Sequence, residues 1–162
     1  MRALVWISEA TWQGCVDRAR ELLPDRAEVT LLHVADGEVE HLAGHPGPER
    51  FGRHRPPPPE PRIRALAESE AQELLAAAAD RFGRAASTSA RRGRAEREVL
   101  AAAGELEIEV LVLAREGERK LGPPSLGRRA RFVVDHACCP VLLVWAGEPP
   151  PVDSIHWPPH LR

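Results

Sequence analysis

The chain has 162 residues, which is enough for one domain with a full hydrophobic core and too few for two domains of ordinary size. Its 22 basic and 24 acidic side chains give a formal net charge of −2, so the overall charge gives no reason to expect a nucleic-acid partner. No stretch approaches the 18 apolar residues of a membrane span, and three cysteines without C-x-x-C spacing are typical of a reducing compartment. We therefore expect a soluble cytoplasmic protein with no membrane partner.

The first half of the chain alternates strand-like and helix-like segments. Residues 3–7 are a continuous apolar run, which is typical of a strand covered on both faces, and residues 29–35 (V-T-L-L-H-V-A) are the second predicted buried strand. Between them, residues 9–23 carry apolar side chains at helical spacing, and Pro24 ends the helix. Residues 36–61 are rich in proline and glycine and lack apolar periodicity, which predicts a flexible insertion.

The second half continues the alternation. Residues 62–82 show the clearest helical pattern in the chain, and residues 85–90 are a weak candidate for a short strand at an edge of the sheet. The remaining expected elements are a helix at 95–103, a strand at 108–114, a helix at 126–137 and a strand at 141–145.

Five strands that alternate with helices predict an α/β fold with a doubly wound parallel sheet. Right-handed crossovers favour the strand order 3-2-1-4-5, as in flavodoxin-like and Rossmann-like folds. Residues 1–146 would form this single domain, and the proline-rich residues 147–162 would form an extended tail.

Three short motifs in the predicted strands carry a resemblance. They are L-L-H-V at residues 31–34, L-V-L-A at 111–114 and H-A-C-C-P-V-L-L-V at 136–144. With these motifs, residues 2–35 and 71–145 resemble the universal stress protein family. The resemblance implies the same sheet order and a homodimer in which the last strands meet across a two-fold axis.

Nucleotide-binding members of that family carry a G-x2-G-x9-G loop followed by Ser or Thr, and an Asp at the end of the first strand. This chain keeps the spacing, with Ala114, Gly117 and Gly127 in the three glycine positions. Arg128 stands where the hydroxyl would be and Ser8 where the Asp would be. A guanidinium holds phosphate well but does not fit the space of a serine hydroxyl, so the loop keeps its spacing and loses part of its donor chemistry.

If an adenine nucleotide binds, the resemblance places it in one pocket at the carboxyl ends of the first and fourth strands. Trp6 and Ile7 add bulk beside this pocket, and one of them is a candidate to occupy the adenine position. The candidate contacts are Ile7, Ser8, Val34, Ala114, Gly117, Gly127, Arg128 and Arg129.

Two functions remain open at this point. One is a dimeric interaction or regulatory module of the stress response, with a degenerate nucleotide pocket, no certain cofactor and unknown protein partners. The other is a stress protein that binds ATP or AMP through the loop at Ala114, Gly117 and Gly127. No hydrolase motif or Ser/His/Asp set occurs, so we predict no catalytic residues, although weak nucleotide hydrolysis stays open.

The remaining reactive side chains receive structural interpretations. His33 and His136 are expected to pack or hydrogen-bond, and the histidines of residues 36–61 lack the fixed geometry of a metal site. Cys138 and Cys139 are expected to be two neighbouring buried thiols. The fifth strand would be an apolar sheet edge that invites pairing with a second copy, through Val141, Leu142, Leu143, Val144 and Trp145.

Overall fold

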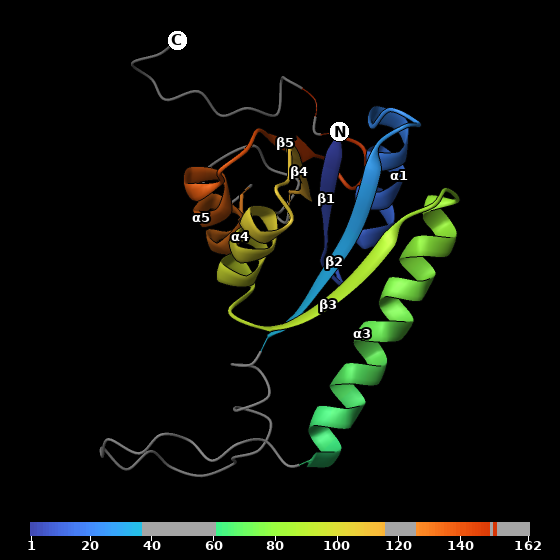
Figure 1. The fold of residues 1–162 in the computed structure, drawn as a ribbon, viewed down its shortest axis with the longest axis vertical. Coiled ribbons are helices and arrows are strands. Elements are labelled where there is room, and N and C mark those ends of the chain that lie inside the picture. Colours follow the sequence, from blue (N-terminus) through green and yellow to red (C-terminus); the bar gives the residue numbers. More distant parts are fainter. Residues whose placement is uncertain (37–60, 116–125, 150, 152–162) are drawn as a thin grey trace.

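The computed structural model describes residues 1–36, 61–115, 126–149 and 151. Within them, five strands alternate with four helices (Figure 1). The elements are β1 (Arg2–Ile7), α1 (Trp12–Leu22), β2 (Glu28–Asp36), α3 (Pro61–Phe82), β3 (Ser87–Gly93), α4 (Ala95–Glu105), β4 (Val110–Ala114), α5 (Arg128–His136) and β5 (Val141–Val144).

The strands form one sheet of order β3-β2-β1-β4-β5 in which every pair is parallel. This confirms the predicted doubly wound architecture. The register places Ile7 of β1 beside His33 of β2, and Trp6 beside Leu113 of β4. The carboxyl ends of β1, β2 and β4 therefore lie along one edge of the sheet.

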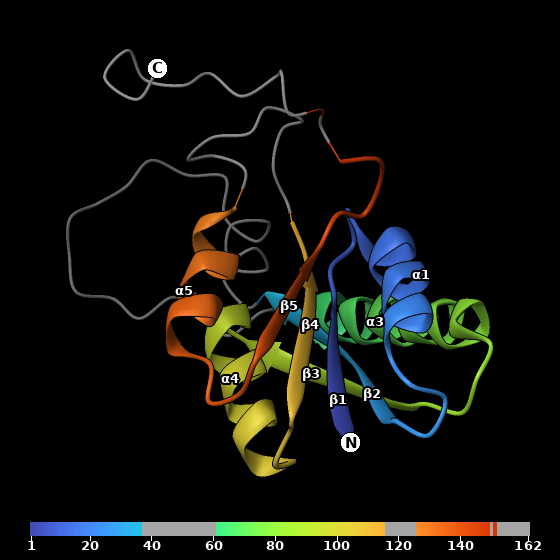
Figure 2. The ribbon, with the colours of Figure 1, turned by 90° about the horizontal axis from the view of Figure 1, so that it is seen from above.

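Helices cover both faces of the sheet, α1 and α3 on one and α4 and α5 on the other (Figures 1 and 2). Alternate strand residues point to opposite faces, so each face has its own core. The core under α1 and α3 contains Val5, Ile7, Leu31, Val112 and Phe82 among its members. The core under α4 and α5 contains Leu4, Trp6, Leu32, Val34, Leu111, Val99 and Val133.

Three local predictions were wrong. α1 begins at Trp12 instead of residue 9, because the chain first makes a turn in which the Thr11 N–H donates to the Ser8 carbonyl at 3.0 Å. Leu22 and Leu66 belong to the apolar spacing that predicts the helices at 9–23 and 62–82, which would place them on buried faces, but they are 56% and 61% exposed. Leu66 belongs to the first part of α3, which runs past the end of the sheet (Figure 1).

β3 extends to Gly93, three residues beyond its predicted end, because β2 continues to Asp36 and supplies a pairing partner for each added residue. It is an edge strand, as expected.

A bidentate ion pair fixes α3 against α1. The Arg81 guanidinium donates to both carboxylate oxygens of Asp17, at 2.8 and 2.6 Å. α3 also has buried residues, among them Ala71, Leu75 and Ala78, and the last two belong to the core on this face of the sheet. α3 forms one wall of a cleft at the carboxyl edge of the sheet.

Candidate functional site

A cleft of about 680 Å³ lies at the carboxyl edge of the sheet, over the ends of β1 and β2. Ligand pockets in proteins commonly have volumes of about 300–1,000 Å³, and doubly wound folds bind ligands at this edge. The lining comes from the β1–α1 turn, the end of β2, one face of α3 and the first residues of α4 and α5. Its residues are Trp6, Ile7, Ser8, Glu9, Ala10, His33, Val34, Ala35, Ala67, Glu70, Ala71, Leu74, Ala95 and Arg129.

His33 is the buried polar residue of this cleft, at 7% exposure. Its Nδ1 lies 2.9 Å from the backbone oxygen of Ile7, which can only accept a hydrogen bond. The imidazole therefore carries a proton on Nδ1. In the neutral ring, Nε2 has no proton and can accept a hydrogen bond. The prediction that His33 hydrogen-bonds is confirmed, and the same bond joins the ends of β1 and β2.

Charged side chains of both signs line the cleft. Glu9 comes from the β1–α1 turn and Glu70 from α3, while Arg129 comes from the first turn of α5. Carboxylates accept hydrogen bonds from amino groups, and an arginine at a helix N-terminus favours an anion. The cleft can therefore hold a molecule that combines hydrogen-bond donors with one negative group.

The gap between the ends of β1 and β4 is narrow. It is bounded by Trp6, Ser8, Thr11, Leu113, Ala114 and Ala130, and it leaves no volume for a water-sized sphere. The Trp6 indole is 8% exposed and packs in the core beneath α4 and α5. At the point where the winding of the sheet reverses, Trp6 and Ala114 both border this gap, and they belong to the cores on opposite faces of the sheet.

The structure divides the predicted contact residues into four groups. Ile7, Ser8, Val34 and Arg129 line the cleft. Ala114 borders the narrow gap, as Ser8 also does. Gly127 is the residue that caps the start of α5, and Arg128 is an exposed residue of its first turn; neither lines the cleft. Gly117 lies outside the described residues.

Several cleft residues were missed at the sequence level, chiefly Ala67, Glu70, Ala71 and Leu74 of α3. They recur at intervals of three and four, so the helical pattern does contain a signal for one shared face. The sequence could not bring that face to the end of β2, because residues 37–60 separate the two elements.

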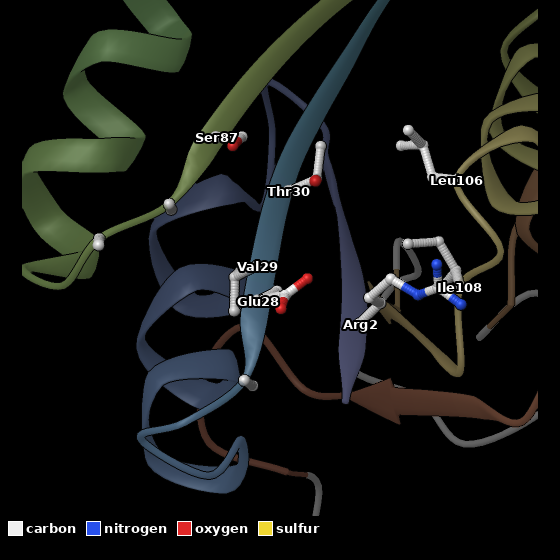
Figure 3. Close-up of a pocket in the computed structure, with 10 residues that line it drawn as sticks. Arg2, Glu28, Val29, Thr30, Ser87, Leu106 and Ile108 are labelled. Atoms are coloured by element: carbon white, nitrogen blue, oxygen red, sulfur yellow. The ribbon is translucent and has the colours of Figure 1, made fainter.

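A second hollow, of about 510 Å³, lies at the opposite, amino edge of the sheet (Figure 3). Glu28 and Thr30 of β2 face Leu106 and Ile108 across it, and Arg2 lies beside them. The Arg2 guanidinium already donates to Glu107 at 2.8 Å, and no helix N-terminus opens toward this edge in a doubly wound fold. We therefore take the carboxyl-edge cleft as the candidate site.

Within the described ranges, no group of three His, Cys, Asp or Glu side chains could hold a metal ion. Among the helices of those ranges, none is both long and apolar enough to cross a membrane.

A family model described as the universal stress protein family matches residues 8–144. The chain belongs to this family. No curated protein matches the sequence.

Solved universal stress proteins share the fold. The protein UspA from Lactobacillus plantarum is 21% identical with a TM-score of 0.58, and the alignment covers 89% of this chain and 97% of that one. A universal stress protein in complex with cAMP is 13% identical with a TM-score of 0.62, covering 91% and 98%. A family protein from Arabidopsis thaliana with AMP bound is 17% identical with a TM-score of 0.55, covering 90% and 91%. At identities this low, the structural similarity establishes a common fold and nothing more.

Proposed function

We propose that this universal stress protein acts in stress response as a dimeric interaction or regulatory module whose adenine-nucleotide pocket is degenerate. The observation that supports it most directly is the narrow gap beside Ala114, which has no volume for a water-sized sphere. A polyphosphate at the switch point of the sheet would need that space and the backbone donors around it. Trp6, Leu113 and Ala114 border it so closely that a water-sized sphere does not fit between them.

The chemistry of the neighbouring positions supports the same proposal. Ser8 places a hydroxyl where a carboxylate would hold a nucleotide, and Arg128 replaces a small hydroxyl at the start of α5. Arg128 is exposed and does not line the cleft. The loss of groups at both positions favours a role in which binding of other proteins, and not nucleotide turnover, is the activity.

The dimer would form through β5, which is an edge strand of the sheet. Its residues Val141, Leu142 and Leu143 are half-buried within one chain, and Val144 is buried. Trp145 follows the strand, with the Arg115 guanidinium 5.0 Å from its ring centroid. A second copy pairing along β5 would cover the remaining apolar area and satisfy the open backbone groups.

The second candidate is a protein that binds ATP or AMP. It is favoured by the open cleft of about 680 Å³ over β1 and β2, which has room for a nucleoside and carries Arg129 at its rim. The fold shared with structures that contain cAMP and AMP motivates the same test. On this alternative, the nucleoside occupies the cleft, and the phosphate lies toward Arg129 and the start of α5.

One experiment separates the two candidates. In the first part, purified protein is heat-denatured and the released small molecules are resolved by anion-exchange chromatography. In the second part, the thermal melting of a separate, native sample is followed with and without millimolar Mg-ATP or AMP. A ligand present at 100 times its Kd stabilises the native state by about 2.7 kcal/mol. For the degenerate pocket we expect no eluted nucleotide and an unchanged Tm; a clear rise in Tm would instead support the second candidate.

A matched pair of variants locates any binding that is found. Arg129→Ala removes the cation that lines the cleft, whereas Arg131→Ala removes an exposed cation from the same helix outside the cleft. Loss of a charge-assisted hydrogen bond lowers affinity about tenfold or more. If Arg129→Ala alone lowers the affinity for the nucleotide, the nucleotide is assigned to the cleft. If both variants lower the affinity equally, the arginines attract the nucleotide through nonspecific electrostatics.

We propose further that the protein is not an enzyme and that it acts in the cytoplasm. The described cleft lining contains Ser8, His33, Glu9 and Glu70, and the Nδ1 of His33 hydrogen-bonds to the backbone oxygen of Ile7. A nucleotide-hydrolysis assay with phosphate detection tests the first statement, and subcellular fractionation tests the second.

A further inference from the structure

The carboxyl-edge cleft has two sides with different chemistry. Alternate residues of β2 point to opposite faces of the sheet, and Leu31 and Leu32 belong to the cores beneath α1 and α3 and beneath α4 and α5, respectively. His33 therefore points to the face that α3 covers, and α3 brings Glu70 to the same cleft. Arg129 belongs to α5, which covers the other face (Figures 1 and 2). The cleft thus has an acidic side next to α3 and a basic side at the start of α5.

His33 presents a hydrogen-bond acceptor without a partner on the α3 side of this cleft. The residue is 7% exposed, and its Nδ1 donates to the Ile7 carbonyl, so Nε2 carries no proton in the neutral ring. Within the described part of the chain, the bond to Ile7 is the one hydrogen bond of this side chain. The fully covered side-chain atom that lacks a partner there is the Nε of Arg84 and not Nε2 of His33, so Nε2 keeps access to the cleft. A buried acceptor with access and no partner favours a ligand that donates an N–H group.

Two carboxylates add to the acceptors of the cleft. Glu9 comes from the β1–α1 turn and Glu70 from α3. No ion pair or hydrogen bond joins either side chain to another residue that the structure describes. Together they outweigh the one guanidinium of the described lining, that of Arg129. The cleft therefore favours a ligand with one more positive than negative charge.

The acceptors are too far apart for a single small cation. Among the described residues, no three His, Cys, Asp or Glu side chains could hold a metal ion, so Glu9, His33 and Glu70 do not converge on one point. A ligand that reaches all three must carry its N–H groups on an extended frame. Apolar side chains of α3 lie between the acceptors and can cover such a frame, because Ala67, Ala71 and Leu74 all line the cleft.

The described lining contains no thiol, because the three cysteines lie elsewhere. Cys15 is buried in the core beneath α1 and α3, and Cys139 is half-buried and packs against the core beneath α4 and α5. Cys138 is exposed, so the expectation of two buried thiols is wrong for this residue. The chemistry of the cleft therefore favours reversible binding through hydrogen bonds and charge.

We propose that the cleft binds a basic α-amino acid, which combines two positively charged nitrogen groups, one carboxylate and a chain of methylene groups. One nitrogen group donates to Nε2 of His33 and to Glu70, and the other faces Glu9. The carboxylate lies toward Arg129 and the start of α5, where a guanidinium and a helix N-terminus favour an anion. This inference goes beyond the proposed function and rests on it only in that no nucleotide occupies the cleft.

The test titrates the native full-length protein with L-lysine and measures the heat of binding. Norleucine keeps the carboxylate and the methylene chain but lacks the side-chain ammonium group, and 1,5-diaminopentane keeps both nitrogen groups but lacks the carboxylate. We expect each analogue to bind about tenfold more weakly than L-lysine, because each loses a charge-assisted hydrogen bond. The proposal fails if millimolar L-lysine does not bind, or if either analogue binds equally well.

Two matched variants locate the binding. Glu70→Gln and Glu73→Gln each neutralise an exposed carboxylate of α3, but only Glu70 lines the cleft. We expect Glu70→Gln to lower the affinity for L-lysine about threefold to tenfold and Glu73→Gln to leave it nearly unchanged. If both variants lower the affinity equally, nonspecific attraction to α3 explains the binding and the site is not the cleft.

Nε2 of His33 gives a direct spectroscopic readout. In protein with ¹⁵N-labelled histidine, L-lysine should shift the Nε2 resonance of His33, because a donated N–H changes the electron density on an acceptor nitrogen. Sodium chloride at the same ionic strength is the control and should leave that resonance in place. If L-lysine binds without shifting it, His33 is not part of the site and the proposal is wrong.

Mg-ATP distinguishes failure of this inference from failure of the proposed function. A rise in Tm with L-lysine alone supports both the amino-acid site and the degenerate nucleotide pocket. A rise with Mg-ATP alone overturns the amino-acid site and supports the nucleotide-binding candidate. A Tm unchanged by both ligands overturns the amino-acid site and leaves the degenerate pocket standing.

Discussion

The two edge strands of the sheet present opposite surfaces. β3 reads S-T-S-A-R-R-G and exposes Ser87, Thr88 and Ala90, and its Arg91 is ion-paired with Glu98 and Glu105 of α4. β5 reads V-L-L-V and carries apolar side chains alone. Polar and charged side chains discourage pairing with another chain, whereas a flat apolar edge invites it. One parallel sheet thus has one protected edge and one edge suited to association.

The chain segments that leave the two edge strands differ in the same way. β3 ends at Gly93, whose φ of +145° suits glycine, next to the Glu98 side chain. After β5 the chain reaches Ala146, whose backbone lies directly against Gly14 of α1. The exit of β5 is therefore fixed by close packing on a helix, and the exit of β3 by a glycine conformation.

The strongest test of this comparison removes one backbone donor from β5. The Leu111 and Arg115 N–H groups donate to the carbonyls of Pro140 and Val144 at 2.9 Å, so alternate residues of β5 face β4 and the Leu143 N–H faces the open edge. Leu143→Pro deletes that donor without breaking the ladder. We expect it to convert a dimer to a monomer, measured by light scattering at micromolar concentration.

Leu143→Ala is the matched control, because it loses the same side-chain packing but keeps the N–H group. It should retain the dimer, as should Thr88→Pro on the other edge strand. If the unaltered protein is itself a monomer at these concentrations, the proposed dimer is contradicted.

The second prediction concerns the exit of β5. In Gly14→Ala the new Cβ would overlap the carbonyl group of Ala146, and because the obstacle is backbone, α1 or the segment after β5 has to move. Such overpacking costs about 1–3 kcal/mol, and we expect a value near the upper end, measured by urea denaturation.

Gly104→Ala provides the comparison within another helix. No heavy atom lies within 4 Å of a Cβ built at Gly104, so this variant should be neutral or more stable by about 0.4–1 kcal/mol. Equal destabilisation by the two substitutions would mean that the contact with Ala146 is not the cause.

The smallest predicted effect lies at β3 and depends on pH. The hydrogen bond and charge of Arg91 hold the pKa of Glu105 below its ordinary value of 4.5. The depressed pKa means that this stabilisation is complete above the unfolded-state pKa and is lost as the pH falls through the folded-state pKa. We expect Glu105→Gln to lower the urea midpoint slightly at pH 7, and we expect this deficit to shrink as the pH falls through the folded-state pKa.

Asp80→Asn, which alters an exposed carboxylate on α3, controls for the general loss of negative charge. A Glu105→Gln deficit that persists unchanged at low pH would show that packing of the side chain, and not its charge, is responsible.

The family and the order of the strands followed from local patterns. Continuous apolar runs, helical spacing and the loop spacing of Ala114, Gly117 and Gly127 were enough, because hydrophobic periodicity and right-handed crossovers leave few topologies. Exposure at the ends of elements was less predictable, as Leu22 and Leu66 show. Whether an apolar residue is covered depends on where its helix runs past the sheet, which periodicity does not encode.

The sequence by itself determined the alternation of strands and helices, the glycine spacing and the apolar character of β5. The tertiary structure decided the rest: that α3 forms a wall of the cleft, that the gap bordered by Trp6 and Ala114 is too narrow for a water-sized sphere, and that Cys138 is exposed beside a half-buried Cys139. These features arise from contacts between residues far apart in the chain or from the path of a single bend. Side-chain periodicity reports which face of an element is apolar, but packing in three dimensions sets which space that face leaves open.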